Sequence, residues 1–306
     1  MSEYSLAAEY GSGRLNYVAR GCDAGRRIKH VLRGELMLSS SLVARIKLLP
    51  DGILLNGERA FTSAVLSPGD ILSVRITDEP SNARIRAVEH PLDIVYEDEC
   101  ILVIDKPAGM AVHPGALAQD SCTVANVLAY RLGEAFTFHP VNRLDRGTTG
   151  LMVVAKSAYI HERLKRTLHA AGENAFYREY RAVVTGVPQP GSGTVELPIG
   201  RAGDSAIKRC IDKDGDSAIT FYEVLSQRNG LALVRLLPFT GRTHQLRVHM
   251  AALGHPLAGD WLYGVEDRSL ISRPALHSYK LRLTHPITGE PLELISPLPE
   301  DMLRLI

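Results

Sequence analysis

Two Asn-Gly dipeptides restrict the fold of this chain more than any other feature of its sequence. "GILLNGE" (residues 52–58) and "VLSQRNGLALV" (residues 224–234) each place Asn-Gly between apolar, strand-like segments. Asn-Gly favours the two-residue turns that join antiparallel strands, because both turn positions need positive φ. Helical segments lie between the strand pairs, and no repeating βαβ pattern is visible. We therefore predict an α+β fold with a mixed, mostly antiparallel sheet.

A polar, irregular stretch divides the chain into two predicted domains. "TDEPSNARIRAVEHP" (residues 77–91) has no apolar periodicity, and we expect a linker near residues 78–91. Two helix-like stretches and the first Asn-Gly turn precede it, which predicts a small α/β module over residues 1–88. The strands after it are longer, and the helix in "SCTVANVLAYRLG" has an expected N-cap at Thr123. Residues 89–306 are expected to form the larger domain.

The composition is typical of a folded protein with no membrane partner. The chain has 306 residues, of which 45% are hydrophobic. No apolar run approaches the roughly 18 residues of a membrane span, and the N-terminus lacks the apolar core of a secretory signal. The four cysteines are too widely spaced to predict a zinc cage or a disulfide framework. We therefore expect a cytoplasmic protein.

Charge is unevenly distributed along the chain, although its total is small. Residues 20–47 contain seven Lys and Arg residues against only Asp23 and Glu35. A net charge of +1 argues against a protein that coats nucleic acid by charge alone, but a regional field can still attract it. This basic segment is therefore either a solvated helix face or a nucleic-acid contact.

One carboxylate stands between two arginines in "HPVNRLDRGTTG" (residues 139–150). Asp145 lies between Arg143 and Arg146, just before the apolar run "LMVVA". It could form a surface ion pair, bind a metal or act as a catalytic carboxylate that a guanidinium keeps ionised. A metal site would need further ligands, yet the nearby histidines show no H-x-x-x-H or H-E-x-x-H spacing, so we expect no metal.

A second group of polar residues lies in "LLPFTGRTHQLRVHMAALGHPLAGDWLYG" (residues 236–264). Five hydrogen-bond donors occupy six positions in a loop and the first turn of a predicted helix: Arg242, Thr243, His244, Gln245 and Arg247. Such a set is suited to bind an anion, although a capped helix with surface arginines is the simpler alternative. "FYREYRAVV" adds Tyr177 and Tyr180, which are either core residues or a platform for a base. Motifs for nucleotide hydrolysis, dinucleotide cofactors and serine esterases are missing from the sequence.

These motifs resemble those of the RluA-type pseudouridine synthases. "HPVNRLDRGTTGLMVVAKS" is similar to the central motif of that family, and "EDECILVIDKPAGMAVHPG", "REYRAVVTG", the segment 236–264 and "LHSYKLRLTHPITGEPLEL" are similar to the others, in family order. The resemblance covers roughly residues 92–298. The sequence departs from the usual pattern at Asn142 (usually His), Thr149 (usually Ser) and Arg178 (usually Lys). The first module resembles an S4-type RNA-binding domain more loosely, since it lacks the usual arginine after the serine.

The resemblance implies a function and roles for individual residues. It implies a monomeric enzyme without cofactor that isomerises specific uridines in structured ribosomal or transfer RNA to pseudouridine. Asp145 would attack the sugar or remove a ribose proton, Tyr180 would pack against the base, and Arg247 rather than Arg242 would hold Asp145 ionised. Arg143 would fill the space of the flipped base, and the other substrate-binding candidates are Arg242, His244 and Gln245. A non-catalytic RNA-binding protein and a metal-dependent nuclease are the alternatives.

Overall fold

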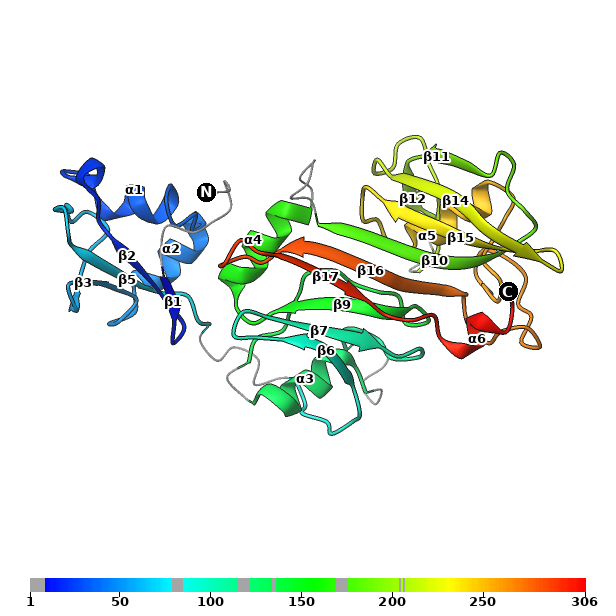
Figure 1. The fold of residues 1–306 in the computed structure, drawn as a ribbon, viewed down its shortest axis with the longest axis horizontal. Helices are drawn as coiled ribbons and strands as arrows, with labels where there is room; N and C mark the ends of the chain where they lie inside the picture. The colour runs from blue at the N-terminus through cyan, green and yellow to red at the C-terminus, as the bar shows by residue number, and fades with distance from the viewer. Residues whose placement is uncertain are drawn as a thin grey trace.

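The computed structural model describes residues 9–78, 85–114, 122–133, 136–168, 176–203, 205 and 207–306. A small N-terminal module forms its own five-stranded sheet, in the order β1-β2-β5-β3-β4. Helices α1 and α2 pack on this sheet, at the left of Figure 1. Its elements are β1 (Glu9–Gly11), β2 (Arg14–Val18), α1 (Ile28–Arg33), α2 (Ser40–Ile46), β3 (Ile53–Leu55), β4 (Glu58–Arg59) and β5 (Ile71–Arg75).

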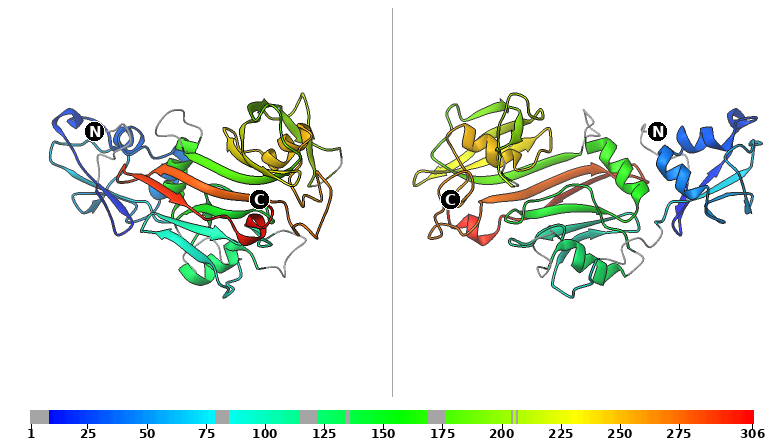
Figure 2. Two further views of the ribbon diagram at one scale, coloured as in Figure 1. Left: turned by 45° about the vertical axis from the view of Figure 1, so that its right-hand side comes forward. Right: turned by 180° about the vertical axis from the view of Figure 1, so that it is seen from behind.

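The rest of the chain is built on a ten-stranded sheet with the path β11-β14-β15-β10-β16-β9-β7-β6, to which β17 and β8 are attached. Every pairing in it is antiparallel except that of β9 with β16, so the predicted α+β fold with a mostly antiparallel sheet is confirmed. Figures 1 and 2 show α3 on one side of this sheet, away from α4 and α5. The strands and helices are β6 (Asp93–Glu97), β7 (Ile101–Lys106), α3 (Val124–Leu132), β8 (His139–Pro140), β9 (Thr149–Ala155), α4 (Ala158–Leu168), β10 (Tyr177–Thr185), β11 (Ser192–Glu196), β14 (Ile219–Arg228), β15 (Leu231–Pro238), α5 (Gln245–Ala252), β16 (Leu276–Thr284), β17 (Pro291–Ile295) and α6 (Glu300–Leu303), with β12 (Ile199–Arg201) and β13 (Arg209–Ile211) forming a separate pair.

Local sequence signals determine several of these elements. Both Asn-Gly pairs turn hairpins: φ is 53° and 87° at Asn56 and Gly57, and 50° and 76° at Asn229 and Gly230. The predicted cap of α3 is also confirmed, because the Thr123 side chain accepts from the Asn126 backbone N–H and Asn126 bonds back to Thr123. Among the described residues, every helix is too short or too polar to cross a lipid bilayer.

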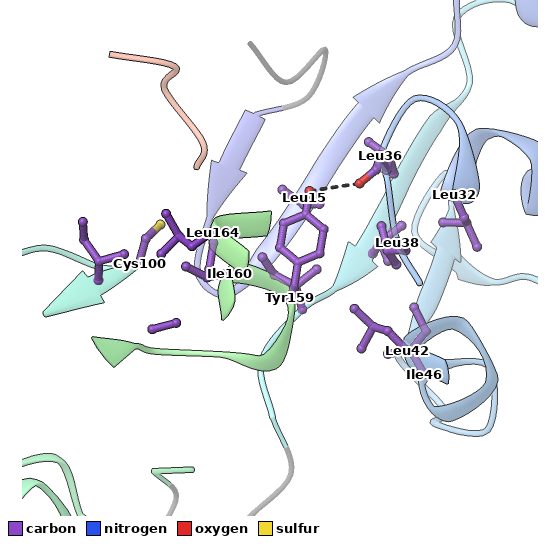
Figure 3. Close-up of a cluster of buried hydrophobic side chains, with 14 of the residues drawn as sticks. Leu15, Leu32, Leu36, Leu38, Leu42, Ile46, Cys100, Tyr159, Ile160 and Leu164 are labelled. Carbon is purple, nitrogen blue, oxygen red and sulfur yellow. Dashed lines mark hydrogen bonds between the residues drawn. The ribbon is translucent and has the colours of Figure 1, made fainter. Parts of the chain in front are cut away.

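The N-terminal module shares one hydrophobic core with the large sheet. Leu36 and Leu38 of the module lie beside Tyr159 of α4 in Figure 3, and Ile160 and Leu164 of α4 belong to the same cluster on the other side of the tyrosine. The buried Tyr159 hydroxyl donates a hydrogen bond of 3.0 Å to the Leu36 carbonyl. This continuous apolar contact holds the module against α4.

The expected linker is attached to both domains where the structure describes it. The side chain of Asp78 is buried and binds Arg45 of α2, the His139 ring and the first backbone N–H of α4. Farther along, the Asn126 side chain of α3 donates to the Arg86 carbonyl at 2.7 Å. The described parts of the predicted linker are irregular, and they contact both domains through Asp78 and Arg86. Residues 79–84 lie outside the described part of the chain.

Candidate active site

A pocket of about 670 Å³ opens beside the middle of the large sheet. Its walls come from segments far apart in the sequence: the loop before β9, the C-terminal half of α4, the start of β10 and the loop before α5. Adjacent strand positions bring these segments together, because β9 and β10 both pair with β16. The pocket is lined by Asp145, Tyr180 and Arg247, the three residues expected to be catalytic, and by Arg143, Arg242, His244 and Gln245.

Asp145 lies on the loop between β8 and β9, and its side chain is 29% exposed to the pocket. Its Oδ2 lies 3.4 Å from Nη1 of Arg247, a residue 102 positions away on α5. The same guanidinium donates two hydrogen bonds of 2.7 Å from Nε and Nη2 to the fully buried Asp260. Asp260 thus fixes the orientation of Arg247, and Arg247 presents its remaining nitrogen to Asp145.

Arg247 remains charged although it is almost completely buried. Burial alone would lower its pKa, but hydrogen bonds and charge from Asp260, with a smaller effect from Asp145, raise the pKa above its usual value. The guanidinium also lies over the ring of Tyr263, with its central carbon 5.0 Å from the ring centroid. The Asp145 carboxylate therefore faces a charged guanidinium that Asp260 and Tyr263 hold in one position.

Lys106 binds the backbone of the loop that carries Asp145. Its side chain is completely buried, and Nζ donates to the carbonyls of Pro107, Met110 and Arg146 at 2.7, 2.9 and 3.2 Å. Burial, followed by the charge of Arg273, lowers the pKa of Lys106 to about 8. Since the Arg146 carbonyl is next in the chain to Asp145, the lysine restricts the position of the carboxylate.

His244 caps α5 in a left-handed conformation, with φ of 59°. Its Nε2 lies 3.9 Å from Asp145 Oδ2, and its Nδ1 lies 2.8 Å from the Tyr263 hydroxyl. Burial lowers the pKa of His244, so the ring is neutral near pH 7. The structure therefore places a neutral imidazole beside the carboxylate.

Gln245 and Arg242 make mostly internal contacts. The Gln245 amide accepts from the Thr240 hydroxyl and the Arg242 backbone N–H, and donates to Ile219 and Thr220. Arg242 Nε donates to the Ser217 carbonyl at 3.0 Å. In this state both residues shape the loop before α5 more than they face the pocket.

Tyr180 is 7% exposed and lines the pocket from β10. Burial raises its pKa, against a smaller lowering by Arg178, Ser278 and Asn142, so the phenol is protonated near pH 7. Tyr177 does not line the pocket, and its hydroxyl donates to Glu179 at 2.7 Å. Asn142, which stands where the resembling family has His, ties the Asp145 loop to β9 by accepting from Val153 N–H at 2.8 Å.

The sequence predicted no role for three residues that the structure places at or behind the site: Thr148, Asp260 and Tyr263. Asp260 and Tyr263 stand in "LAGDWLYG", which is part of the motif in residues 236–264. Lys106 stands in the polar loop "KPAGMAVHPG", whose sequence suits either a surface turn or the rim of an active site. Thr148 is almost fully buried at the pocket wall, and its hydroxyl has no hydrogen-bond partner. The sequence could not predict that this hydroxyl is buried without a hydrogen-bond partner, because burial depends on the tertiary structure.

Among the described residues, one group of three potential metal ligands exists, and it excludes Asp145. It comprises Asp98, Cys100 and His285. The His285 Nδ1 accepts from the Thr288 backbone N–H at 3.1 Å, so its proton is on Nε2, which faces Asp98 at 3.0 Å. A protonated Nε2 is a hydrogen-bond donor and not a metal ligand, which argues for a structural contact here.

Comparisons with known proteins identify the class of enzyme to which this fold and site belong, the RNA-modifying isomerases. The family described as RNA pseudouridylate synthase matches residues 100–252. The chain is 42% identical over 277 residues to the uncharacterized RNA pseudouridine synthase YjbO of Bacillus subtilis, covering 89% of this chain and 96% of that protein. It is 40% identical over 276 residues to the ribosomal large subunit pseudouridine synthase D of Pseudomonas aeruginosa, covering 83% and 85%.

Solved structures show the same relationship. The human RNA pseudouridylate synthase domain containing 1 superposes with a TM-score of 0.56 and 30% identity, over 68% of this chain and 83% of that chain. The chain belongs to the RNA pseudouridylate synthase family. It is therefore an isomerase that converts uridine in RNA to pseudouridine.

Proposed function

We propose that Asp145 is the catalytic carboxylate of this isomerisation. The observation that carries the proposal is the chain of contacts from Asp145 through Arg247 to the buried Asp260, at the wall of a nucleotide-sized pocket. In the reaction the bond from uracil N1 to ribose C1′ breaks, the uracil turns, and C5 bonds to the same carbon. Asp145 either attacks C1′ as a nucleophile or removes a ribose proton, and Tyr180 packs against the base and helps remove the C5 proton.

The charge of the pocket supports an RNA substrate. Six Lys and Arg residues line it against one carboxylate, Asp145; they are Arg143, Arg146, Lys165, Arg178, Arg242 and Arg247. A uridine must leave its stack to reach Asp145, which costs a few kcal/mol. Arg143 is exposed at the pocket mouth, and we assign it to the space that the flipped base vacates. His244 and Arg242 contact the substrate once the RNA has entered, and Gln245, whose amide is fully hydrogen-bonded within the protein, holds the loop that carries them.

We further propose a division of labour between the two domains. Residues 1–88 act as an RNA anchor, and residues 89–306 carry the catalysis. A surface groove of about 390 Å³ between α1 and α2 is lined by Lys29, Arg33 and Lys47, which suits a phosphate backbone. Because several relatives, the Pseudomonas aeruginosa protein among them, are named for the large ribosomal subunit, ribosomal RNA is the preferred substrate, with transfer RNA as the second candidate. We place the enzyme in the cytoplasm as a monomer that needs no cofactor.

Replacing Asp145 tests the proposal. Asp145→Asn keeps the size of the side chain but can neither attack the sugar nor remove a proton. We expect the release of tritium from RNA labelled at uracil C5 to stop, while the RNA dissociation constant and the melting temperature stay close to those of the parent protein. Appreciable turnover by the purified variant would refute the assignment of Asp145.

A further inference from the structure

Four cations that line the pocket have no carboxylate partner within the described residues, and one of them, Arg146, donates to the Gly109 carbonyl at 2.8 Å. The other three are Arg143 on the Asp145 loop, Lys165 on α4 and Arg178 on β10. Most other arginines of the structure pair with acids, as Arg247 does with Asp260 and Arg181 with Glu179. The three cations are also close enough to repel each other, since after burial the charges of Arg143 and Arg178 lower the pKa of Lys165.

Arg178 is the most unusual of the three. Its side chain is only 8% exposed, its Nε has no hydrogen-bond partner, and its Nη2 donates to one neutral acceptor, the Pro238 carbonyl at 3.1 Å. A guanidinium keeps its charge even when buried, and burying a charge without a counter-ion is unfavourable. Gly241 leaves room for it, because a Cβ at that position would lie 3.3 Å from Arg178 Nη1.

The nature of the missing counter-ion follows from the position of Arg178. It is two residues before Tyr180 on β10, and both side chains line the same pocket. Uracil is neutral and would leave the charge of Arg178 uncompensated, whereas a phosphodiester carries a full negative charge and two free oxygens for a guanidinium fork. We infer that Arg178, with Lys165, binds one backbone phosphate next to the target uridine, while Arg143 keeps its place at the space left by the flipped base. The inference rests on the proposed function, and it goes further because it assigns a subsite for the RNA backbone.

Replacing single phosphates of the RNA tests this subsite. Stem-loop substrates carry an uncharged methylphosphonate at one position, on either side of the target uridine, and dissociation constants are measured for the parent protein, Arg178→Met and Arg178→Lys. We expect one methylphosphonate to weaken binding to the parent protein about as much as Arg178→Met weakens binding to unmodified RNA. When the two changes are combined, the dissociation constant should rise no further than with either change alone, because both remove the same contact.

The salt dependence gives a second reading. Arg178→Met should reduce the slope of log affinity against log salt by roughly 0.7–0.9, the contribution of one phosphate, whereas Arg178→Lys keeps the charge and most of the slope. If Arg178→Met does not fold, Arg178→Lys still tests whether the substitution and one methylphosphonate act on the same contact. The lysine keeps the charge but loses the guanidinium that can bond both phosphate oxygens. The proposal would be overturned if Arg178→Met and the methylphosphonate multiplied each other's loss of affinity at every phosphate position.

Matched controls separate this subsite from general electrostatics. Arg181→Met changes an arginine of the same strand that is paired with Glu179, and Arg166→Met changes the neighbour of Lys165 that is paired with Glu162. Neither residue lines the pocket, so neither variant should couple to any methylphosphonate. Inhibition by inorganic phosphate at matched ionic strength, with no methylphosphonate coupling, would assign the site to a free anion and overturn the RNA assignment.

The outcome for the proposed function is read separately. Binding constants and salt slopes do not require turnover, so they report on the phosphate subsite even if tritium release fails. The parent protein could release tritium while the affinity losses from Arg178→Met and from each methylphosphonate multiply. That pair of results would refute the phosphate subsite and leave the proposed function standing.

Discussion

At the scale of single residues, the carboxylate expected to be catalytic depends on a partner that is itself held in place. Arg247 makes its two short hydrogen bonds to Asp260 and a longer contact of 3.4 Å to Asp145. The stronger, buried pair therefore orients the guanidinium, and Asp145 is left with free oxygen lone pairs for the substrate. Arg143 and Arg146, the neighbours of Asp145 in the sequence, make no ion pair with it in the described structure.

The orphaned hydroxyl of Thr148 leads to a prediction at this scale. Thr148→Val replaces an unpaired buried hydroxyl with a methyl group, so we expect unfolding stability to be unchanged or slightly higher. If the hydroxyl bonds to the substrate, the single-turnover rate should fall roughly 2- to 12-fold, the factor that corresponds to about 0.5–1.5 kcal/mol.

Thr149 is the matched control for this prediction. Its hydroxyl is 2.9 Å from His277 Nδ1, and it does not line the pocket. Thr149→Val should therefore lower stability, by about 1 kcal/mol, and change the rate little. Urea unfolding and single-turnover kinetics measure both effects, and identical behaviour of the two variants would contradict a substrate contact of Thr148.

At the scale of elements, the loop that carries Asp145 is held by a strand and a loop that lie far from it in the sequence. The Arg146 Nε donates to the Gly109 carbonyl at 2.8 Å, and the Gly109 N–H donates to the Arg146 carbonyl at 2.9 Å. This pair joins the loop after β7 to the loop before β9. Lys106 at the end of β7 bonds to carbonyls of both loops, so β7 supports the position of Asp145 without reaching the pocket.

Lys106→Met tests this support. The substitution keeps a long apolar stem but leaves the Pro107 and Met110 carbonyls without this donor, while the Arg146 carbonyl keeps the Gly109 N–H. We therefore expect a loss of about 1–3 kcal/mol in unfolding free energy and a lower rate at saturating RNA. Lys156→Met is the control, because Lys156 pairs with Glu97 in a partly exposed ion pair that contributes about 0.2–1 kcal/mol. Equal stability and rate for both variants would contradict the role of Lys106.

At the scale of the whole molecule, the two domains share one of the hydrophobic clusters and present their basic sites together. The module contributes Leu36 and Leu38 to the core that α4 shares. In Figures 1 and 2, α1, α2, α4 and α5 follow one another along the same side of the molecule. The groove between α1 and α2 and the pocket near α4 and α5 can therefore contact one structured RNA.

Deleting residues 1–88 should for this reason do more than weaken RNA binding. The deletion uncovers Tyr159, Ile160 and Leu164, so we expect a lower melting temperature and self-association of the shortened protein. Lys29→Gln, Arg33→Gln and Lys47→Gln in the full chain remove only charge. They should reduce affinity and its salt slope while leaving melting and the rate on a short, saturating substrate unchanged. Full affinity after both changes would show that the module is not an RNA anchor.

Two buried histidines make the folded protein sensitive to acid. Burial lowers the pKa of His249 and His277 below the usual 6.5, so the unfolded chain binds protons at a pH where the folded chain does not. Stability is therefore complete above pH 6.5 and is lost as the pH falls towards the folded-state pKa values. Urea unfolding at pH 7.5 and at about pH 5.5 measures this, and His249→Gln should flatten the dependence. A stability that does not change between these pH values would contradict the burial of neutral histidines.

Features that depend on near neighbours in the chain could be predicted from the amino-acid sequence. Asn56-Gly57 and Asn229-Gly230 specify their hairpins because their backbones accept positive φ, and Thr123 caps α3 through a residue only three positions away. The resemblance to a family had already pointed to Arg247 as the cation beside Asp145. Only the folded chain shows that Asp260 orients this arginine and that the N-terminal module docks on α4. These contacts depend on the order of β9, β16 and β10 in the sheet, and that order is set by long-range packing of buried strands, which short-range patterns do not encode.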